Sequence, residues 1–171
     1  MKRLTLIRHA NADWKNASVP DFDRPLNKRG LGEAEALGKL LLEQELMPDL
    51  MLVSPARRTQ QTTEILVRKL ELPARRVKAA ENLYLATLED VLTLVHATGP
   101  KVQHLAVVGH NPGLSELAKD MAPAGVAIVD LSTGAACTLT FTARAWGNIN
   151  APAARALQLQ PPTTLFSSLF T

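Results

Sequence analysis

The chain has 171 residues, the length of one domain with a hydrophobic core of its own. With 46% hydrophobic and 20% charged residues, it has the composition of a globular protein rather than a disordered one. Aromatic residues make up only 4%, which disfavours a nucleic-acid-binding surface, and the net charge of +3 fits either a solvated surface or attraction to an anionic, phosphorylated partner.

Nothing in the sequence indicates a membrane span or a secreted protein. No apolar stretch approaches the ~18 residues that cross a bilayer. The apolar run that ends before Arg8 is too short for a secretory signal. The one cysteine, Cys137, excludes an internal disulfide, and its position in an apolar segment predicts a buried thiol. We therefore expect a cytoplasmic protein with no membrane partner.

Short apolar runs alternate with longer helical patterns along the chain, which predicts an α/β domain with a largely parallel sheet. The predicted strands are 3–7, 50–53, 76–79, 104–108, 136–141 and 156–159. The predicted helices are 29–46, 55–71, 88–97 and 113–121. We expect a three-layer α/β/α domain with a central, mostly parallel sheet over residues 1–160, followed by an apolar C-terminal tail, 161–171.

The first long helix shows an apolar stripe at helical spacing. Its expected members are Leu31, Ala34, Leu37, Leu41 and Leu42. Glu33 is placed off this stripe, and Asn27 is the expected N-cap. Two further helix starts are expected at Ser54-Pro55 and Asn111-Pro112, each read as an N-cap followed by proline at the first helical position.

Polar residues follow three of the predicted strands. They are Arg8 and His9 after the first strand, Ser54 with Arg57 and Arg58 after the second, and His110 with Asn111 after the fourth. Ligands bind at the carboxyl ends of strands in open α/β sheets, so we expect these side chains to share one crevice. Guanidinium groups bind phosphate in a bidentate fashion, a neutral imidazole is a nucleophile toward phosphorus, and a protonated imidazole stabilises the transferring group.

Neither a metal-ligand motif nor a nucleotide-binding glycine loop accompanies these residues. The sequence therefore predicts phosphoryl chemistry carried by side chains alone, with no metal and no cofactor. Outside the motifs, His96 and His104 are expected at the surface and Trp146 in the core or a turn. Trp14 either walls the pocket or packs nearby.

Three segments resemble the histidine phosphatase superfamily, which also contains the cofactor-dependent phosphoglycerate mutases. They are Leu6-Ile7-Arg8-His9-Ala10, the segment from Ser54 to Thr62, and Val108-Gly109-His110-Asn111. The short chain, Asp23-Arg24-Pro25-Leu26-Asn27 and Gly109-His110-Asn111-Pro112-Gly113-Leu114 are most similar to the SixA-type phosphohistidine phosphatases. The resemblance covers roughly residues 3–120 and implies a phosphoglycerate mutase-like fold.

The resemblance implies that His9 is phosphorylated while Arg8, Arg58 and His110 bind the phosphoryl oxygens. Arg58 falls on the motif position, so Arg57 is expected to be peripheral. Glu81 lies where the mutases place a glutamate and is the candidate general acid, although a solvated carboxylate is an equal alternative.

Ala10 replaces the commoner glycine, which suggests that the backbone there avoids positive φ. Many relatives carry an asparagine six residues after the nucleophile, where this chain has Lys15 followed by Asn16. Asn16 and Asn111 are therefore added as candidate substrate-binding residues.

The substrate implied by the resemblance is phosphohistidine on a protein, such as a phosphotransfer domain of a signalling relay. A phosphatase of small phosphomonoesters with the same site is the nearest alternative. A non-catalytic phosphate- or phosphopeptide-binding module is a second alternative, disfavoured because a binder needs no nucleophile. A mutase is disfavoured because the short chain has little room for the loops that hold a second phosphate.

Overall fold

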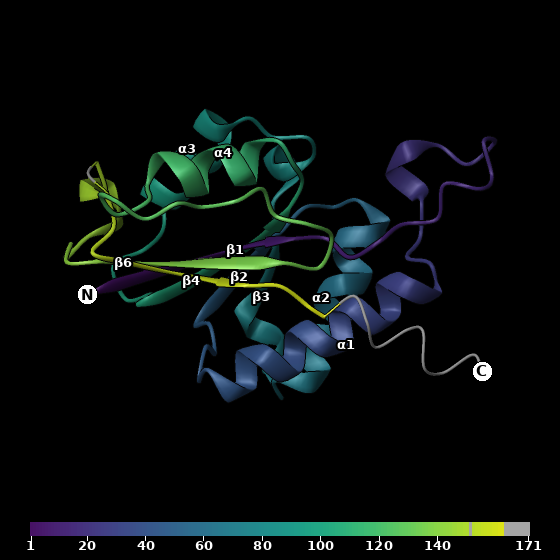
Figure 1. Cartoon of the computed structure of the whole chain (residues 1–171), viewed down its shortest axis with the longest axis horizontal. Coiled ribbons are helices and arrows are strands. Elements are labelled where there is room, and N and C mark those ends of the chain that lie inside the picture. The colour runs from purple at the N-terminus through teal and green to yellow at the C-terminus, as the bar shows by residue number, and fades with distance from the viewer. Residues whose placement is uncertain (151, 163–171) are drawn as a thin grey trace.

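The computed structural model describes residues 1–150 and 152–162, so the expected tail beyond residue 162 lies outside the described residues. One six-stranded sheet crosses the molecule in the order β3-β2-β4-β1-β5-β6 (Figure 1). The strands are β1 (Lys2–Arg8), β2 (Leu50–Val53), β3 (Val77–Ala79), β4 (His104–Gly109), β5 (Ala136–Phe141) and β6 (Arg155–Leu159). Pairing is parallel from β3 through β1 and antiparallel on both sides of β5. The mostly parallel sheet is confirmed.

Helices cover both faces of this sheet, which confirms the three-layer α/β/α architecture. They are α1 (Lys28–Glu43), α2 (Arg57–Lys69), α3 (Leu88–His96) and α4 (Gly113–Asp120). Figure 1 shows α3 and α4 on one side and α1 and α2 on the other. Alternate residues of β1 follow this division, because Leu6 packs in the first core and Ile7 in the second. A strand buried on both faces needs apolar residues throughout, as the sequence of β1 and β4 indicates.

The buried face of α1 differs from the expected stripe. Leu31 and Leu42 are 47% and 40% exposed, so their predicted burial is wrong. The buried residues of α1 are Gly30, Glu33, Ala34, Leu37, Gly38 and Leu41. Glu33 can be buried because its carboxylate pairs with Arg29 at 2.9 Å and accepts hydrogen bonds from the Asn11 backbone N–H and the Thr133 hydroxyl. The predicted N-cap is confirmed, since Asn27 Oδ1 accepts from the Gly30 N–H at 2.8 Å.

The two predicted proline-containing helix starts are wrong in detail. Helix α2 begins at Arg57 after Ala56, with no side-chain cap; the Ser54 hydroxyl contacts His110 and accepts at 3.4 Å from the Ala56 N–H, before the helix begins. Helix α4 begins at Gly113, and the preceding Asn111–Pro112 peptide bond is cis. A Cβ at Gly113 would lie 2.2 Å from the Ala86 carbonyl oxygen, so glycine permits the close approach of α4 to the segment before α3.

Polar side chains are also buried inside the sheet layer. His104 is 3% exposed, and its Nε2 lies 2.7 Å from the Thr5 hydroxyl, so the predicted surface position is wrong. Trp146 is buried, as expected of a core residue, and donates from Nε1 to the Val102 carbonyl. Cys137 is buried, and burial raises the pKa of its thiol to about 11.

Among the described residues, no helix is long and apolar enough to cross a membrane.

Candidate active site

The two site histidines follow neighbouring strands of the sheet in the same register. Arg8 of β1 pairs with Gly109 of β4, so His9 and His110 come next on the two parallel strands. The His9 N–H continues the ladder to the Gly109 carbonyl at 3.1 Å. The ring centroids of the two histidines are 5.3 Å apart. The strand ends therefore bring together the two imidazoles that the sequence placed in one crevice.

The hydrogen bonds of His9 fix its tautomer. Its Nδ1 lies 2.8 Å from the Ala10 carbonyl oxygen, which only accepts, so Nδ1 carries the proton. Its Nε2 is left unprotonated, and its lone pair accepts from Arg58 Nε at 3.3 Å. Burial, together with the positive charges of Arg58 and Arg8, lowers the pKa of His9 to about 4, against the hydrogen bond to Ala10. His9 is therefore neutral at neutral pH.

The buried guanidinium of Arg58 has two edges with different partners. On the outer edge, Nη1 donates to the Asp21 carbonyl at 2.7 Å and Nη2 to Asp21 Oδ2 at 3.1 Å. On the inner edge, Nε faces His9 Nε2 and Nη2 lies 3.4 Å from His110 Nδ1. The inner edge thus spans both histidines, and the outer edge is held by one residue of the 3-10 helix Asp21–Asp23.

His110 is neutral in this arrangement. A guanidinium only donates, so Nδ1 of His110 accepts from Arg58 and the ring proton lies on Nε2. That proton is donated to the Ser54 hydroxyl at 2.7 Å. Burial, then the nearby His9 and Arg58, lowers the pKa of His110 to about 3. His110 therefore becomes a protonated imidazole only when a bound anion raises its pKa.

Arg8 and Asn111 converge on one backbone carbonyl. Arg8 Nη1 donates to the Leu131 oxygen at 3.0 Å, and Asn111 Nδ2 donates to the same oxygen at 2.9 Å. Asn111 Oδ1 accepts from the Ser115 hydroxyl at 2.8 Å. The buried Nε of Arg8 has no hydrogen-bond partner, which leaves a donor available beside His9. Both polar ends of Asn111 are thus used to hold the protein itself.

Other predicted site residues lie apart from this cluster. Asn16 is exposed, and its side-chain oxygen accepts from the Ser18 N–H and hydroxyl. Glu81 is exposed in the 3-10 helix Glu81–Leu83, and no hydrogen bond or ion pair joins it to the described residues of the cluster. Arg57 is exposed, whereas its neighbour Arg58 is buried.

Two residues of the site were missed by the sequence analysis. Besides contacting Arg58, Asp21 Oδ2 accepts a hydrogen bond from the Tyr84 hydroxyl at 2.5 Å. The Tyr84 ring meets His110 edge-on, with centroids 5.6 Å apart. Burial opposes ionisation of Asp21, but the Tyr84 hydrogen bond and the Arg58 charge outweigh it and lower the carboxyl pKa. Asp21 lies outside every motif segment of the sequence, and nothing around it distinguishes it from Asp13.

The rim beside Arg58 carries Trp14. This indole is 57% exposed, and its ring lies 4.7 Å from the guanidinium carbon of Arg24 and 5.9 Å from that of Arg58. Both separations are within the range of cation–π contact. Trp14 thus packs on Arg24 and lies near the site arginine, and its place in the wall of the pocket stays a prediction.

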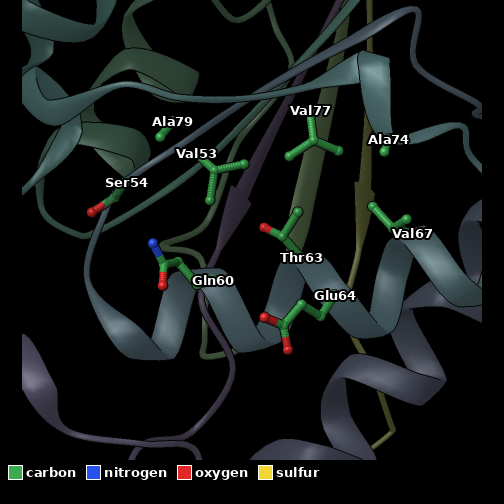
Figure 2. A pocket seen from close by; sticks show the side chains of 9 residues that line it. All are labelled: Val53, Ser54, Gln60, Thr63, Glu64, Val67, Ala74, Val77 and Ala79. Atoms are coloured by element: carbon green, nitrogen blue, oxygen red, sulfur yellow. The ribbon is translucent and has the colours of Figure 1, made fainter.

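A separate groove of about 400 Å³ lies between α2 and the edge strand β3. Figure 2 shows side chains of α2, among them Thr63 and Val67, facing Val53 and Val77 across it. Ser54, the partner of His110, stands at one end. The lining is mostly aliphatic and contains neither histidine nor arginine, so this groove is distinct from the histidine pair.

The arrangement can hold an anion against a neutral nucleophile. His9 Nε2 and His110 Nδ1 each present a ring lone pair to the inner edge of Arg58, and the Nε of Arg8, the residue before His9, has no hydrogen-bond partner. Among the residues that the structure describes, no group of three or more histidine, cysteine or acidic side chains is placed to hold a metal ion.

The sheet order and the facing histidines define a phosphoglycerate mutase-like α/β protein. The chain belongs to the histidine phosphatase superfamily (branch 1), whose model matches residues 4–111.

Two solved structures named SixA resemble this chain along most of its length. The protein from Agrobacterium tumefaciens is 32% identical, with a TM-score of 0.72 over 82% of this chain and 92% of that one. The protein histidine phosphatase SixA in complex with tungstate is 25% identical, with a TM-score of 0.77 over 93% and 97% of the two chains. A chloroplastic protein of Arabidopsis thaliana is 29% identical over 133 residues, 73% of this chain. The chain spans 61% of that relative's length.

Proposed function

We propose that this chain is a phosphatase that forms a covalent phosphohistidine on His9. The observation that carries the proposal is the unprotonated Nε2 of His9, which faces the inner edge of a buried arginine beside a second imidazole. A neutral ring nitrogen so placed is an activated nucleophile, and the surrounding donors stabilise charge on a transferring phosphoryl group.

The reaction has two steps. In the first, His9 Nε2 attacks phosphorus in line, the N–P bond forms, and the bond to the leaving group breaks. Arg8, Arg58 and His110 hold the equatorial oxygens, with the His110 proton taken up when the anion binds. In the second step, water attacks phosphorus, the N–P electron pair returns to His9, and phosphate leaves. No metal or cofactor takes part in either step.

The substrate we propose is phosphohistidine on a signalling protein. The similarity to the SixA phosphohistidine phosphatases supports this choice. The exposed position of Glu81 supports it too, because an alcohol leaving group needs a positioned acid. An imidazole protonated on its far nitrogen departs neutral and needs little assistance, since the pKa of its conjugate acid is near 6.5.

Rapid trapping tests the nucleophile. Brief incubation with a 32P-labelled phosphohistidine protein, followed by a denaturing quench, should leave label on His9 that is acid-labile and stable in alkali. The His9→Ala variant should show neither label nor turnover. Label on Ser54 or Cys137, or full activity without His9, would exclude this mechanism.

A substrate panel tests the specificity. Turnover of a phosphohistidine protein is compared with turnover of small phosphomonoesters at matched enzyme concentration. A kcat/KM highest for the phosphohistidine protein supports the proposal. A preference for phosphomonoesters assigns the same site to small-molecule substrates, and binding of phosphate without any turnover assigns it to a non-catalytic module.

A further inference from the structure

A carboxylate stands at the entrance of the histidine pair. The Asp21 side chain is 41% exposed, whereas that of Arg58, to which it is joined, is 3% exposed. Asp21 therefore connects the buried cluster with solvent. Its negative charge acts on both His9 and His110, where it opposes the lowering of the pKa.

Asp21 does not occupy the edge of Arg58 that faces the histidines. Its backbone oxygen and Oδ2 take the outer edge, formed by Nη1 and Nη2, while Nε and the second Nη2 proton remain on the side of the two rings. A phosphoryl group at the inner edge and the Asp21 carboxylate can thus be bound to Arg58 at the same time. The carboxylate then lies next to the substrate instead of being displaced by it.

The carboxylate is held in place by a second residue. Tyr84 donates to the same oxygen, Oδ2, and the Tyr84 ring packs edge-on against both His110 and Phe22. Both side-chain hydrogen bonds of Asp21 go to Oδ2, so Oδ1 takes part in neither. An immobilised carboxylate with one oxygen free at the mouth of the site is a preorganised hydrogen-bond acceptor.

We propose that Asp21 is a specificity-determining residue that accepts a hydrogen bond from the leaving ring of a phosphohistidine substrate, an inference that rests on the proposed function. When His9 attacks, the substrate N–P bond breaks and its electron pair stays on the ring nitrogen. The proton already on the far nitrogen makes the departing imidazole neutral. That N–H is a donor that Asp21 can bind while the ring is still positively charged. The leaving oxygen of an alkyl phosphate offers no such donor and gains negative charge, which the carboxylate repels.

The Asp21→Asn variant separates this role from support of Arg58. Asparagine keeps an oxygen for the Arg58 hydrogen bond but removes the charge. Any residual misplacement of Arg58 lowers kcat/KM for both substrate classes alike, so it cancels when the kcat/KM for one substrate is divided by that for the other. We therefore measure kcat/KM for a phosphohistidine protein and for glycerol phosphate with wild type and Asp21→Asn. The kcat/KM for the phosphohistidine protein divided by that for glycerol phosphate should be at least tenfold lower in Asp21→Asn than in wild type.

Asp23→Asn is the matched control, because Asp23 is exposed two residues along the same 3-10 helix. Its ratio should stay within about threefold of wild type. Tyr84→Phe, which frees the carboxylate without removing it, should give an intermediate ratio, and thermal unfolding should show all three variants folded. An unchanged ratio in Asp21→Asn overturns the inference. Failure of the proposed function is distinct, since the wild type itself would then not hydrolyse phosphohistidine.

Discussion

Arg58 donates from Nε to Nε2 of His9 at 3.3 Å, so the nitrogen proposed to attack phosphorus is also the one the arginine holds. Removing one preorganised donor of this kind commonly lowers kcat by roughly 10²–10³-fold. We predict a loss of that size or more for Arg58→Ala. Arg57→Ala is the matched control, because that side chain is exposed, and it should stay within about tenfold of wild type. Steady-state kinetics decide this, and equal losses would contradict the assignment.

Binding of an oxyanion should take up a proton. The pKa of His110 is about 3 in the free site, mainly because of burial, and a dianion beside Nδ1 favours the charged ring. Affinity for tungstate should therefore rise as pH falls from 8 to 6. Calorimetric titration in buffers of different ionisation enthalpy measures the proton uptake directly. His110→Gln should bind with less uptake, and buffer-independent heats for wild type would rule out this linkage.

Acid should destabilise the protein before its carboxylates titrate. Burial, most of all, lowers the pKa of His104 to about 4, below the ordinary 6.5 of an unfolded chain. The unfolded state thus binds the proton more readily, so the stability due to neutral His104 is complete above pH 6.5 and is lost as pH falls toward 4. The slope is at most about 1.4 kcal/mol per pH unit for one histidine.

Urea unfolding at a series of pH values measures this slope. His104→Gln removes one titrating group, so its free energy of unfolding should depend less steeply on pH between 6.5 and 4, even if the variant is less stable throughout. Parallel pH profiles for the two proteins would show that His104 is protonated equally in the folded and unfolded states.

Glu81→Gln should leave turnover of a phosphohistidine protein within about tenfold of wild type. Glu81 is exposed and forms no hydrogen bond or ion pair with the described residues of the histidine cluster. A true general acid contributes roughly 10²–10⁴-fold, so the two cases are well separated. Measurement of kcat/KM on phosphohistidine and on an alkyl phosphate tests the prediction. A loss above about a hundredfold on phosphohistidine would identify Glu81 as the acid and favour phosphomonoester substrates.

The strands and the residues that follow them were predictable, because a parallel strand buried on both faces leaves an apolar run in the sequence. The close approach of His9 and His110 then follows from the meeting of strand ends at one edge. The sequence predicts Ser54 as a helix cap, and only the structure shows its hydroxyl beside His110. A serine that caps a helix and a serine that contacts a site histidine look alike in the sequence, because both follow the end of a strand.

Tertiary contacts also limited what could be predicted: the sequence does not show that Asp21 and Tyr84 meet or that Glu33 is buried. Asp21 and Tyr84 belong to separate connections whose meeting over Arg58 depends on tertiary packing, which no local periodicity encodes. The apolar pattern places Glu33 off the buried stripe, yet its carboxylate is buried, where it pairs with Arg29 and accepts hydrogen bonds from the Asn11 N–H and the Thr133 hydroxyl. Arg29 lies one turn away, but the two uncharged donors are distant in the chain, so the burial of Glu33 depends on tertiary packing.

The β1–β4 ladder places the backbones of the two histidines side by side, since the residues just before them are register partners. Side chains alternate along a strand, so a slip of one residue would turn a ring to the opposite face of the sheet. The ladder also joins distant parts of the chain: Thr5 and His104, which contact each other within it, are 99 residues apart. During synthesis, the N-terminal strand therefore leaves the ribosome long before its partner. The newly made chain acquires its reactive centre late, when β4 has emerged and paired.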